Sequence, residues 1–301
     1  MDREEQISPR NSYKSQNVFQ EDLDIWETLM FKIGIRAHDI GKMSAKELSE
    51  TVHALGFDGI QLVFKKALLD EVDFNHLSEL KESLRHTKIM MLGAYFNPVH
   101  PDYKELIQGV EYFEKHLKIA KELHADYVGS ETGSLMGSPW GYVKENHDDL
   151  RLKHVIDIFR KLVSTAEKHD SYVAIEGAYA HVCYSPFRIK QVIEAIHSKH
   201  LKVTIDLFNF LSIENYQKRM EIFEESLKLL KNDIVIYHLK DFIIEDGKLM
   251  QVGLGKGLMD YPKIIKRIEE VTPNAYLIFE GVTGADIPES LKLIKDLIER
   301  K

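Results

Sequence analysis

Residues 234–241 read IVIYHLKD, an apolar and mostly β-branched run of strand length that ends in a histidine. Three other stretches repeat the pattern with an acid at the end: YVAIEG at 172–177, KVTIDLFN at 202–209 and AYLIFEG at 275–281. A loop and a helical pattern follow each run. One side chain of the kind that binds metals therefore ends each of four successive predicted strands: Glu176, Asp206, His238 and Glu280.

The alternation of strand and helix begins earlier in the chain. Apolar runs predict four further strands at 31–37, 59–64, 89–96 and 126–131. Helical patterns follow the eight strands, at about 45–55, 73–86, 102–124, 147–169, from Ser185, 214–231, after Pro262 and 286–300. This count predicts a (β/α)8 TIM barrel over residues 31–301. An open doubly wound sheet is the alternative, but it would spread the four ligand-type residues along one edge.

Two helix ends carry specific signals. Ser44 and Glu47 form a capping-box pattern, and Gly56 predicts the end of the same helix. Ser185 followed by Pro186 predicts the start of a later helix.

Residues 1–30 are expected to be an N-terminal extension. Residues 1–17 are polar, which predicts disorder. Residues 18–30 place apolar side chains at helical spacing, which predicts a short amphipathic helix that caps the barrel or contacts a partner subunit.

Bulk composition excludes several classes of protein. The net charge of −8 argues against nucleic acid as the main partner, because phosphate binding needs a concentrated basic surface. The single cysteine, Cys183, forbids an internal disulfide and fits a reducing cytosol. No apolar run is long enough to span a membrane, and the N-terminal residues lack a signal-peptide core. We therefore expect a cytoplasmic protein that has no membrane or nucleic-acid partner.

Strand periodicity predicts where the ligand-type residues point. Successive strand residues alternate sides, so Glu176 shares a face with Ala174, and Asp206 shares a face with Thr204. Small or polar neighbours suit a narrow barrel interior. The carboxyl ends of the strands converge at one mouth of a barrel. Three carboxylates and one imidazole there predict a site for Mn²⁺, Mg²⁺, Co²⁺ or Zn²⁺.

These motifs resemble the xylose isomerase-like barrels, and more narrowly the sugar phosphate isomerase/epimerase group related to the tagatose and psicose 3-epimerases. HLKDF at 238–242 and VGLGKGLMDY at 252–261 are similar to the loop that follows strand seven in that group. The resemblance covers roughly residues 31–300. It implies metal ligands at Glu176, Asp206, His238 and Glu280. It also implies that Glu176 and Glu280 are the catalytic pair that removes and returns a proton next to a carbonyl.

The chain departs from the epimerase pattern at two positions. Asn209 stands where those enzymes have a histidine, and Ile244 stands where they have an arginine. Asn209 can still hydrogen-bond a sugar hydroxyl. The endonuclease IV branch needs additional zinc-binding histidines, and His238 is the one histidine on these four predicted strands.

Further polar residues are predicted around the mouth as substrate contacts. They are Glu131, Lys240, Asn209, Arg36, Gln61, Asn97, His100 and Trp140, with His181 as a weaker candidate. Glu131 can instead pair with Lys240, and Lys240 can bind an anion or neutralise an acid. Trp140 lies in a Gly-rich stretch long enough to form a lid. Gly253–Gly257 is a candidate phosphate cradle, although it lacks the spacing of a P-loop.

Three functions compete. The first is a divalent-metal-dependent isomerase or epimerase of a small sugar or sugar phosphate. The second is a lyase of the same barrel that dehydrates a keto-inositol or a dehydroshikimate-like acid, since it begins with the same proton abstraction. The third is a non-catalytic sugar-binding barrel. Barrels of the resembled group commonly dimerise or tetramerise, so a homo-oligomer is also expected.

Overall fold

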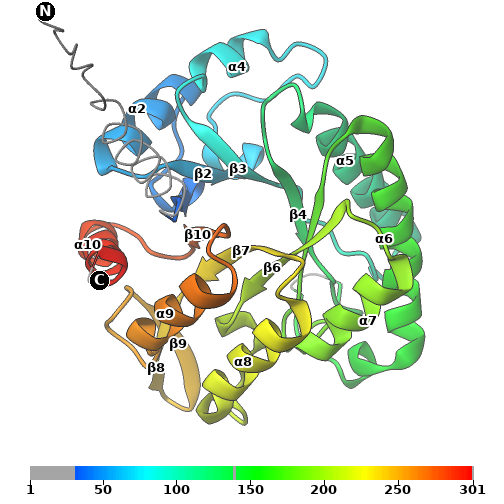
Figure 1. The fold of residues 1–301 in the computed structure, drawn as a ribbon. Coiled ribbons are helices and arrows are strands. Elements are labelled where there is room, and N and C mark those ends of the chain that lie inside the picture. Colours follow the sequence, from blue (N-terminus) through cyan, green and yellow to red (C-terminus); the bar gives the residue numbers. More distant parts are fainter. Residues whose placement is uncertain (1–30, 138–139, 300–301) are drawn as a thin grey trace, which may run out of the picture. The chain divides into compact units, whose positions relative to one another are not determined.

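The chain folds into the closed barrel that its sequence predicts (Figure 1). The computed structural model describes residues 31–137 and 140–299. Within these ranges eight parallel strands pair in the order β1-β10-β7-β6-β5-β4-β3-β2, and β1 pairs with both β10 and β2. This closure rules out the open sheet. The strands are β1 (Ile33–Arg36), β2 (Gly59–Leu62), β3 (Lys88–Gly93), β4 (Tyr127–Glu131), β5 (Val173–Glu176), β6 (Leu201–Asp206), β7 (Ile234–Leu239) and β10 (Tyr276–Phe279).

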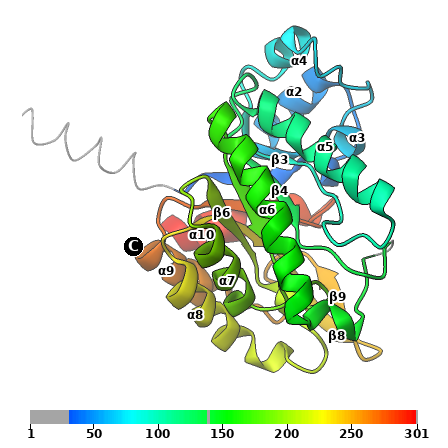
Figure 2. The same ribbon diagram turned by 90° about the vertical axis from the view of Figure 1, so that its right-hand side faces the viewer.

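Helices lie outside the strands and cover their outer faces (Figures 1 and 2). They are α2 (Ala45–Leu55), α3 (Phe64–Ala67), α4 (Ser78–Ser83), α5 (Tyr103–Ala120), α6 (Asp149–His169), α7 (Pro186–Ile196), α8 (Arg219–Leu230), α9 (Tyr261–Val271) and α10 (Asp286–Glu299). The buried outer faces of the strands and the inner faces of the helices make one large hydrophobic core.

Some helix boundaries differ from the prediction for local reasons. The helix expected at 73–86 covers Ser78–Ser83, because the Asp73 carboxylate accepts a hydrogen bond from the Asn75 backbone N–H at 2.9 Å and forms a turn there. The helix expected from 214 begins at Arg219, after a 3-10 turn over Tyr216–Lys218.

The predicted helix caps are confirmed. Ser44 and Glu47 form both bonds of the capping box, and Gly56 ends α2 in the left-handed region at φ 82°. Ser185 caps α7 and Pro186 occupies its first turn.

The barrel interior is a separate, smaller core. Ala174, Ile236 and Ile278 lie in it with Met90 and Met91. These first three residues stand two positions before Glu176, His238 and Glu280, so the ligand-type side chains share the inner face. The prediction from strand alternation is therefore confirmed. The interior is tightly filled, since a Cβ on Gly129 would lie 2.3 Å from the Met91 sulfur.

A β-hairpin follows β7 where the sequence analysis expected a loop. It consists of β8 (Asp241–Glu245) and β9 (Lys248–Val252), paired antiparallel. Asp246 and Gly247 at its tip both have positive φ, at 48° and 72°. An Asp-Gly pair between strands is a strong signal for such a turn, so the hairpin was readable in the sequence.

Residues 1–30, with the predicted disorder and amphipathic helix, lie outside the described residues. Among the described helices, none combines the length and the hydropathy that crossing a membrane requires.

Candidate metal centre

The four ligand-type residues meet at the carboxyl end of the barrel. Glu176 and Asp206 end β5 and β6, His238 is next to last in β7, and Glu280 directly follows β10. The strands place them side by side, because Asp206 is in register with His238, and His238 with Ile278. All four are buried, with at most 7% of any residue exposed. Adjacent parallel strands thus bring together groups that are about a hundred residues apart in the chain.

The imidazole of His238 lies among the carboxylates. Its Nδ1 is 3.4 Å from Glu176 Oε1, 3.8 Å from Asp206 Oδ2 and 3.1 Å from Glu280 Oε2. Ligand atoms of Glu176, Asp206 and His238 all lie within 4.8 Å of one another, which suits a single ion. Glu280 adjoins this group through His238.

Lys240 lies in the middle of the acids. Its Nζ is 2.7 Å from Asp206 Oδ2 and 2.7 Å from Glu280 Oε1. Arg36 reaches Glu280 Oε1 from β1, also at 2.7 Å, while it pairs with Asp39. Of the two roles considered for Lys240, the structure shows the neutralisation of acids. Within the described part of the chain its ion pairs are with Asp206 and Glu280, not with Glu131.

Together, burial and the neighbouring charges raise the pKa values of Asp206 and His238 and lower the pKa of Glu280. Burial raises the pKa of Asp206 to about 6, although Lys240 opposes the shift. Burial would also raise the pKa of Glu280, but Lys240, His238 and Arg36 outweigh it and hold that pKa far below its usual range. Burial opposes protonation of His238, yet Glu176 and Glu280 raise its pKa to about 9. A proton and a metal ion therefore compete for the imidazole.

Unsatisfied polar atoms test whether the site fits a metal ion. His238 Nε2 is buried without a hydrogen bond, and the buried Asp206 Oδ2 and Glu280 Oε2 make none of good geometry, although they lie within ion-pair distance of Lys240 and His238. Such atoms are costly in a protein interior. A divalent ion would satisfy the two oxygens, and the set of carboxylates and imidazole is of the kind that Mn²⁺, Mg²⁺, Co²⁺ and Zn²⁺ take. The residues present therefore fit such an ion.

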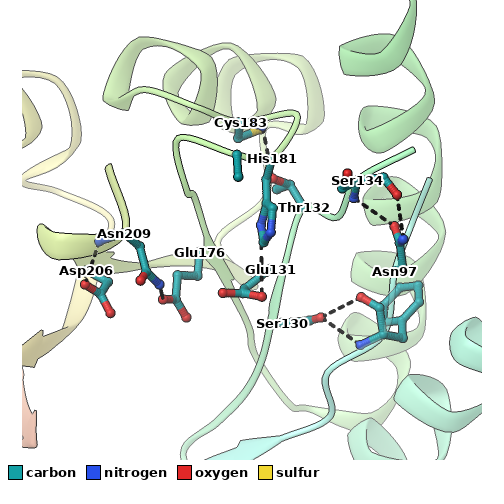
Figure 3. A network of polar contacts seen from close by, with 12 residues as sticks. Asn97, Ser130, Glu131, Thr132, Ser134, Glu176, His181, Cys183, Asp206 and Asn209 are labelled. Carbon is teal, nitrogen blue, oxygen red and sulfur yellow. Dashed lines mark hydrogen bonds and ion pairs between the residues drawn. The ribbon is translucent and has the colours of Figure 1, made fainter. Parts of the chain in front are cut away.

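Asn209 holds the ligands in place (Figure 3). Its Nδ2 donates to Glu176 Oε1 at 2.7 Å and its backbone N–H donates to Asp206 Oδ1 at 3.0 Å. Its Oδ1 accepts from Lys240 Nζ at 3.1 Å. The assignment of Asn209 to a sugar hydroxyl stays a prediction, and these contacts show that the residue also holds Glu176, Asp206 and Lys240 together. The sequence did contain a signal for these contacts, since an Asn three residues after a strand-end Asp can close a short turn.

Glu131, His181 and Trp140 form a second layer around the centre. Glu131 is in register with Glu176, and its Oε2 is 4.0 Å from His181 Nδ1 (Figure 3). Burial, with Glu176 adding to it, raises the pKa of Glu131 to about 8. The Trp140 ring packs edge-on against His181, with centroids 5.7 Å apart. Nothing in these contacts tests their assignment as substrate contacts, which stays a prediction.

Gln61 and Tyr95 cover the opposite side of the mouth. Gln61 is fully buried, and its Nε2 donates to the Tyr95 hydroxyl at 2.8 Å. Its Oε1 is left without a hydrogen bond. Burial and then Glu176 and Glu280 raise the pKa of Tyr95 well above its usual value, so its hydroxyl keeps its proton. The sequence analysis missed Tyr95, because a lone aromatic after a strand carries no distinctive pattern.

Asn97 and His100, in the NPVHP segment after β3, hydrogen-bond backbone groups of the loops around them. The Asn97 amide donates to the backbone oxygens of Ser134 and Gly137 and accepts from two backbone N–H groups, so it anchors the loop after β4 (Figure 3). It has no unused donor for a sugar. His100 Nδ1 accepts from the Asp102 backbone N–H at 3.1 Å, and its other nitrogen makes no hydrogen bond to a residue that the structure describes.

The Gly253–Gly257 segment wraps a carboxylate of the chain itself. Asp241 is fully buried and accepts backbone hydrogen bonds from Gly255, Gly257 and Met259, all within 3.0 Å. A Cβ on Gly257 would lie 2.3 Å from that carboxylate. The predicted phosphate cradle is therefore wrong, because its N–H groups already bind an internal anion.

Comparison with known proteins agrees with this geometry. The model of the xylose isomerase-like TIM barrel family matches residues 50–297. No curated protein matches the chain. Solved structures that are similar to it include several that share 14–18% identity, and these therefore show the fold alone.

One is a xylose isomerase-like TIM barrel protein from Mycobacterium smegmatis in complex with magnesium, with a TM-score of 0.69, 16% identity and coverage of 90% of this chain and 97% of that one. A second is 3-keto-D-glucoside 4-epimerase from E. coli, with a TM-score of 0.68, 15% identity and coverage of 88% and 99%. A third is a probable 3-DHS dehydratase from Bacillus anthracis, with a TM-score of 0.66, 15% identity and coverage of 90% and 100%. The closed barrel and the family match lead to one conclusion: the chain belongs to the xylose isomerase-like TIM barrel family.

Proposed function

We propose that this barrel is a divalent-metal-dependent isomerase or epimerase of a small keto-sugar. The observation that carries the proposal is the position of Glu176 and Glu280 on either side of His238 Nδ1, at 3.4 and 3.1 Å. Their strands are three places apart in the ring of eight, so the two carboxylates approach the mouth from different directions. Two carboxylates on different sides of a bound sugar can remove a proton from one face and return it to the other.

In this proposal Glu176, Asp206, His238 and Glu280 hold the ion. When bound, it would polarise the substrate carbonyl and stabilise the enediolate charge. Glu176 and Glu280 move the proton at the carbon next to the carbonyl. Asn209 keeps Glu176 in place through its 2.7 Å hydrogen bond, and Arg36 and Lys240 keep Glu280 ionised. Glu131, Gln61, Trp140 and His100 remain as proposed contacts of the sugar hydroxyls.

The test is hydrogen exchange. Protein purified with Mn²⁺ is incubated in D₂O with a panel of ketoses and their phosphates, and proton NMR follows deuterium at the carbon next to the carbonyl. We expect exchange with at least one ketose, and a loss of about 10²–10⁴-fold in Glu176→Gln and in Glu280→Gln. Glu194→Gln is the matched control, because Glu194 is exposed on α7 and pairs with Lys190. Metal-loaded protein that exchanges no ketose would refute the proposal.

Dehydration is the second candidate, because it shares the first proton abstraction and one similar structure is a probable dehydratase. The same samples distinguish the two by mass spectrometry. An epimerase product keeps the mass of its substrate, whereas a lyase product is lighter by one water.

A further inference from the structure

A hollow opens at the mouth of the barrel, next to β2 and β3. Its volume is about 490 Å³, which is the size of a small-molecule site. The residues on which the inference depends are Lys65, Lys66, Tyr95, Glu105 and Trp140. Lys65 and Lys66 come from α3, and Glu105 comes from the first turn of α5. The hollow is thus built by the loops at the same carboxyl end of the barrel as the centre.

Two aromatic residues connect the hollow with the centre. Tyr95 lines the hollow, and the charges of Glu176 and Glu280 act on its hydroxyl. Trp140 lines both this hollow and an adjoining one, whose walls include Glu131, His181 and Asn209. Tyr95 and Trp140 therefore belong both to the wall of the hollow and to the surroundings of the centre.

The two regions differ in charge. At the centre, each cation is already paired, since Lys240 contacts two carboxylates and Arg36 contacts Glu280 and Asp39. Lys65 and Lys66 are exposed, and neither forms an ion pair with a residue in the described ranges. Lys65 Nζ lies 5.2 Å above the Tyr112 ring, which leaves its charge available. The acid in the lining is Glu105, so the lysines leave the hollow with excess positive charge.

We propose that the substrate carries an anionic group, a phosphate or a carboxylate, which Lys65 and Lys66 bind in this hollow while the carbonyl end lies at the metal centre; the inference rests on the function proposed above. The cations of the centre are held by its carboxylates, whereas Lys65 and Lys66 form no ion pair within the described ranges and can attract an anion, which orients the substrate. Lysine ammonium groups suit this task, because they bind phosphate and carboxylate oxygens through charge-assisted hydrogen bonds. The sequence analysis named Gly253–Gly257 as a candidate phosphate cradle, but that segment is closed on Asp241.

Calorimetric binding of matched sugars tests the inference. The probes are D-fructose 6-phosphate, D-tagatose 6-phosphate and the two neutral ketoses, each added to metal-free and to Mn²⁺-loaded protein. We expect at least one phosphorylated probe to bind about tenfold or more tightly than its neutral parent. Lys65→Glu with Lys66→Glu should abolish this preference, and the double Met variant should weaken it with less disturbance of the surface.

Lys115→Glu with Lys118→Glu is the matched control. These two lysines are also exposed and line a different hollow, so the variant makes the same charge change away from the proposed site. It should keep the preference. Equal binding of every phosphorylated and neutral probe, or a preference that survives the Lys65 and Lys66 double variants, overturns the inference. A preference that instead disappears with Glu176→Gln and His238→Ala places the anion on the metal and also overturns it.

Failure of the proposed function gives a different result. Deuterium exchange into ketoses without any preference for the anionic sugar contradicts the lysine site and leaves the isomerase proposal intact. A preference that depends on Lys65 and Lys66, without exchange in any ketose, supports the anion site and contradicts the isomerase proposal.

Discussion

The two sides of the barrel mouth are built differently. On the side of β5, β6, β7 and β10, the polar groups are buried and contact one another, as Lys240 does with Asp206 and Glu280. On the side of β2 and β3, a hollow of about 490 Å³ is lined by the lysines of α3 and by aromatic residues. The first side has the order that a metal site requires, because its ligands are positioned before any ion binds. The second side has open volume and unpaired charge, which suits the variable part of a substrate.

The largest expected effect comes from destroying the ordered side. Glu176→Gln with His238→Ala removes two of the three grouped ligands and leaves Lys240 to pair with Asp206 and Glu280. We expect about one Mn, Co, Zn or Mg ion per chain in the wild type and none in the variant, by elemental analysis. Retention of the metal by the variant would contradict the ligand assignment. Circular dichroism should show that the variant stays folded.

A smaller effect should follow from removing the support of the ligands. Asn209→Ala deletes the hydrogen bonds to Glu176 and Lys240 but leaves every ligand present. Loss of such a supporting contact typically lowers metal affinity about 10–100-fold. Competition with a chromogenic chelator measures it. Asn215→Ala is the control, since within the described residues the Asn215 side chain bonds local backbone groups, the Phe210 oxygen and the Ser212 N–H. An unchanged affinity in Asn209→Ala would remove this residue from the centre.

The hydrogen bonds from Gly253–Gly257 to Asp241 predict that replacing this aspartate lowers the stability of the fold. Asp241→Asn turns one acceptor oxygen into a donor that faces the N–H groups of Gly255, Gly257 or Met259. An unsatisfied buried group of this kind costs about 1–3 kcal/mol of unfolding free energy. Urea unfolding followed by fluorescence measures the change. Asp260→Asn, at the nearby cap of α9, should cost less, because Asp260 is exposed and its side chain accepts one backbone hydrogen bond. Equal costs would contradict the role given to Asp241.

The smallest effect should lie at the boundary of the two sides. Tyr95→Phe removes the hydroxyl that accepts the Gln61 hydrogen bond but keeps the ring in the wall of the hollow. A hydrogen bond is worth about 0.5–1.5 kcal/mol, so we expect KM to rise less than about tenfold, with metal content unchanged. Steady-state kinetics with the best ketose of the panel checks this. A fall in metal content would place Tyr95 among the groups that order the metal centre.

The sequence predicted the parts of the site whose signals are local. Strand alternation placed Glu176 and Asp206 on the inner face, and the position of each ligand at a strand end follows from the length of its apolar run. Contacts between side chains of different strands were harder to predict from the sequence. The pairing of Lys240 with Glu280, and not with Glu131, depends on which strands are neighbours in the closed ring. The role of Asn97 as a loop anchor depends on the path of residues 133–137, which no pattern in the chain specifies.

By itself, the sequence determined the strand and helix order, the capping of α2 and α7 and the identities of the ligand-type residues, because periodicity and capping act over a few positions along the chain. The tertiary structure alone decided that Asp241 closes Gly253–Gly257, that Asn209 joins Glu176 to Lys240, and that Lys65 and Lys66 face a hollow shared with Tyr95 and Trp140. Those contacts join separate elements. Their geometry is set by the packing of the closed barrel and its loops, and packing is a property of the whole fold.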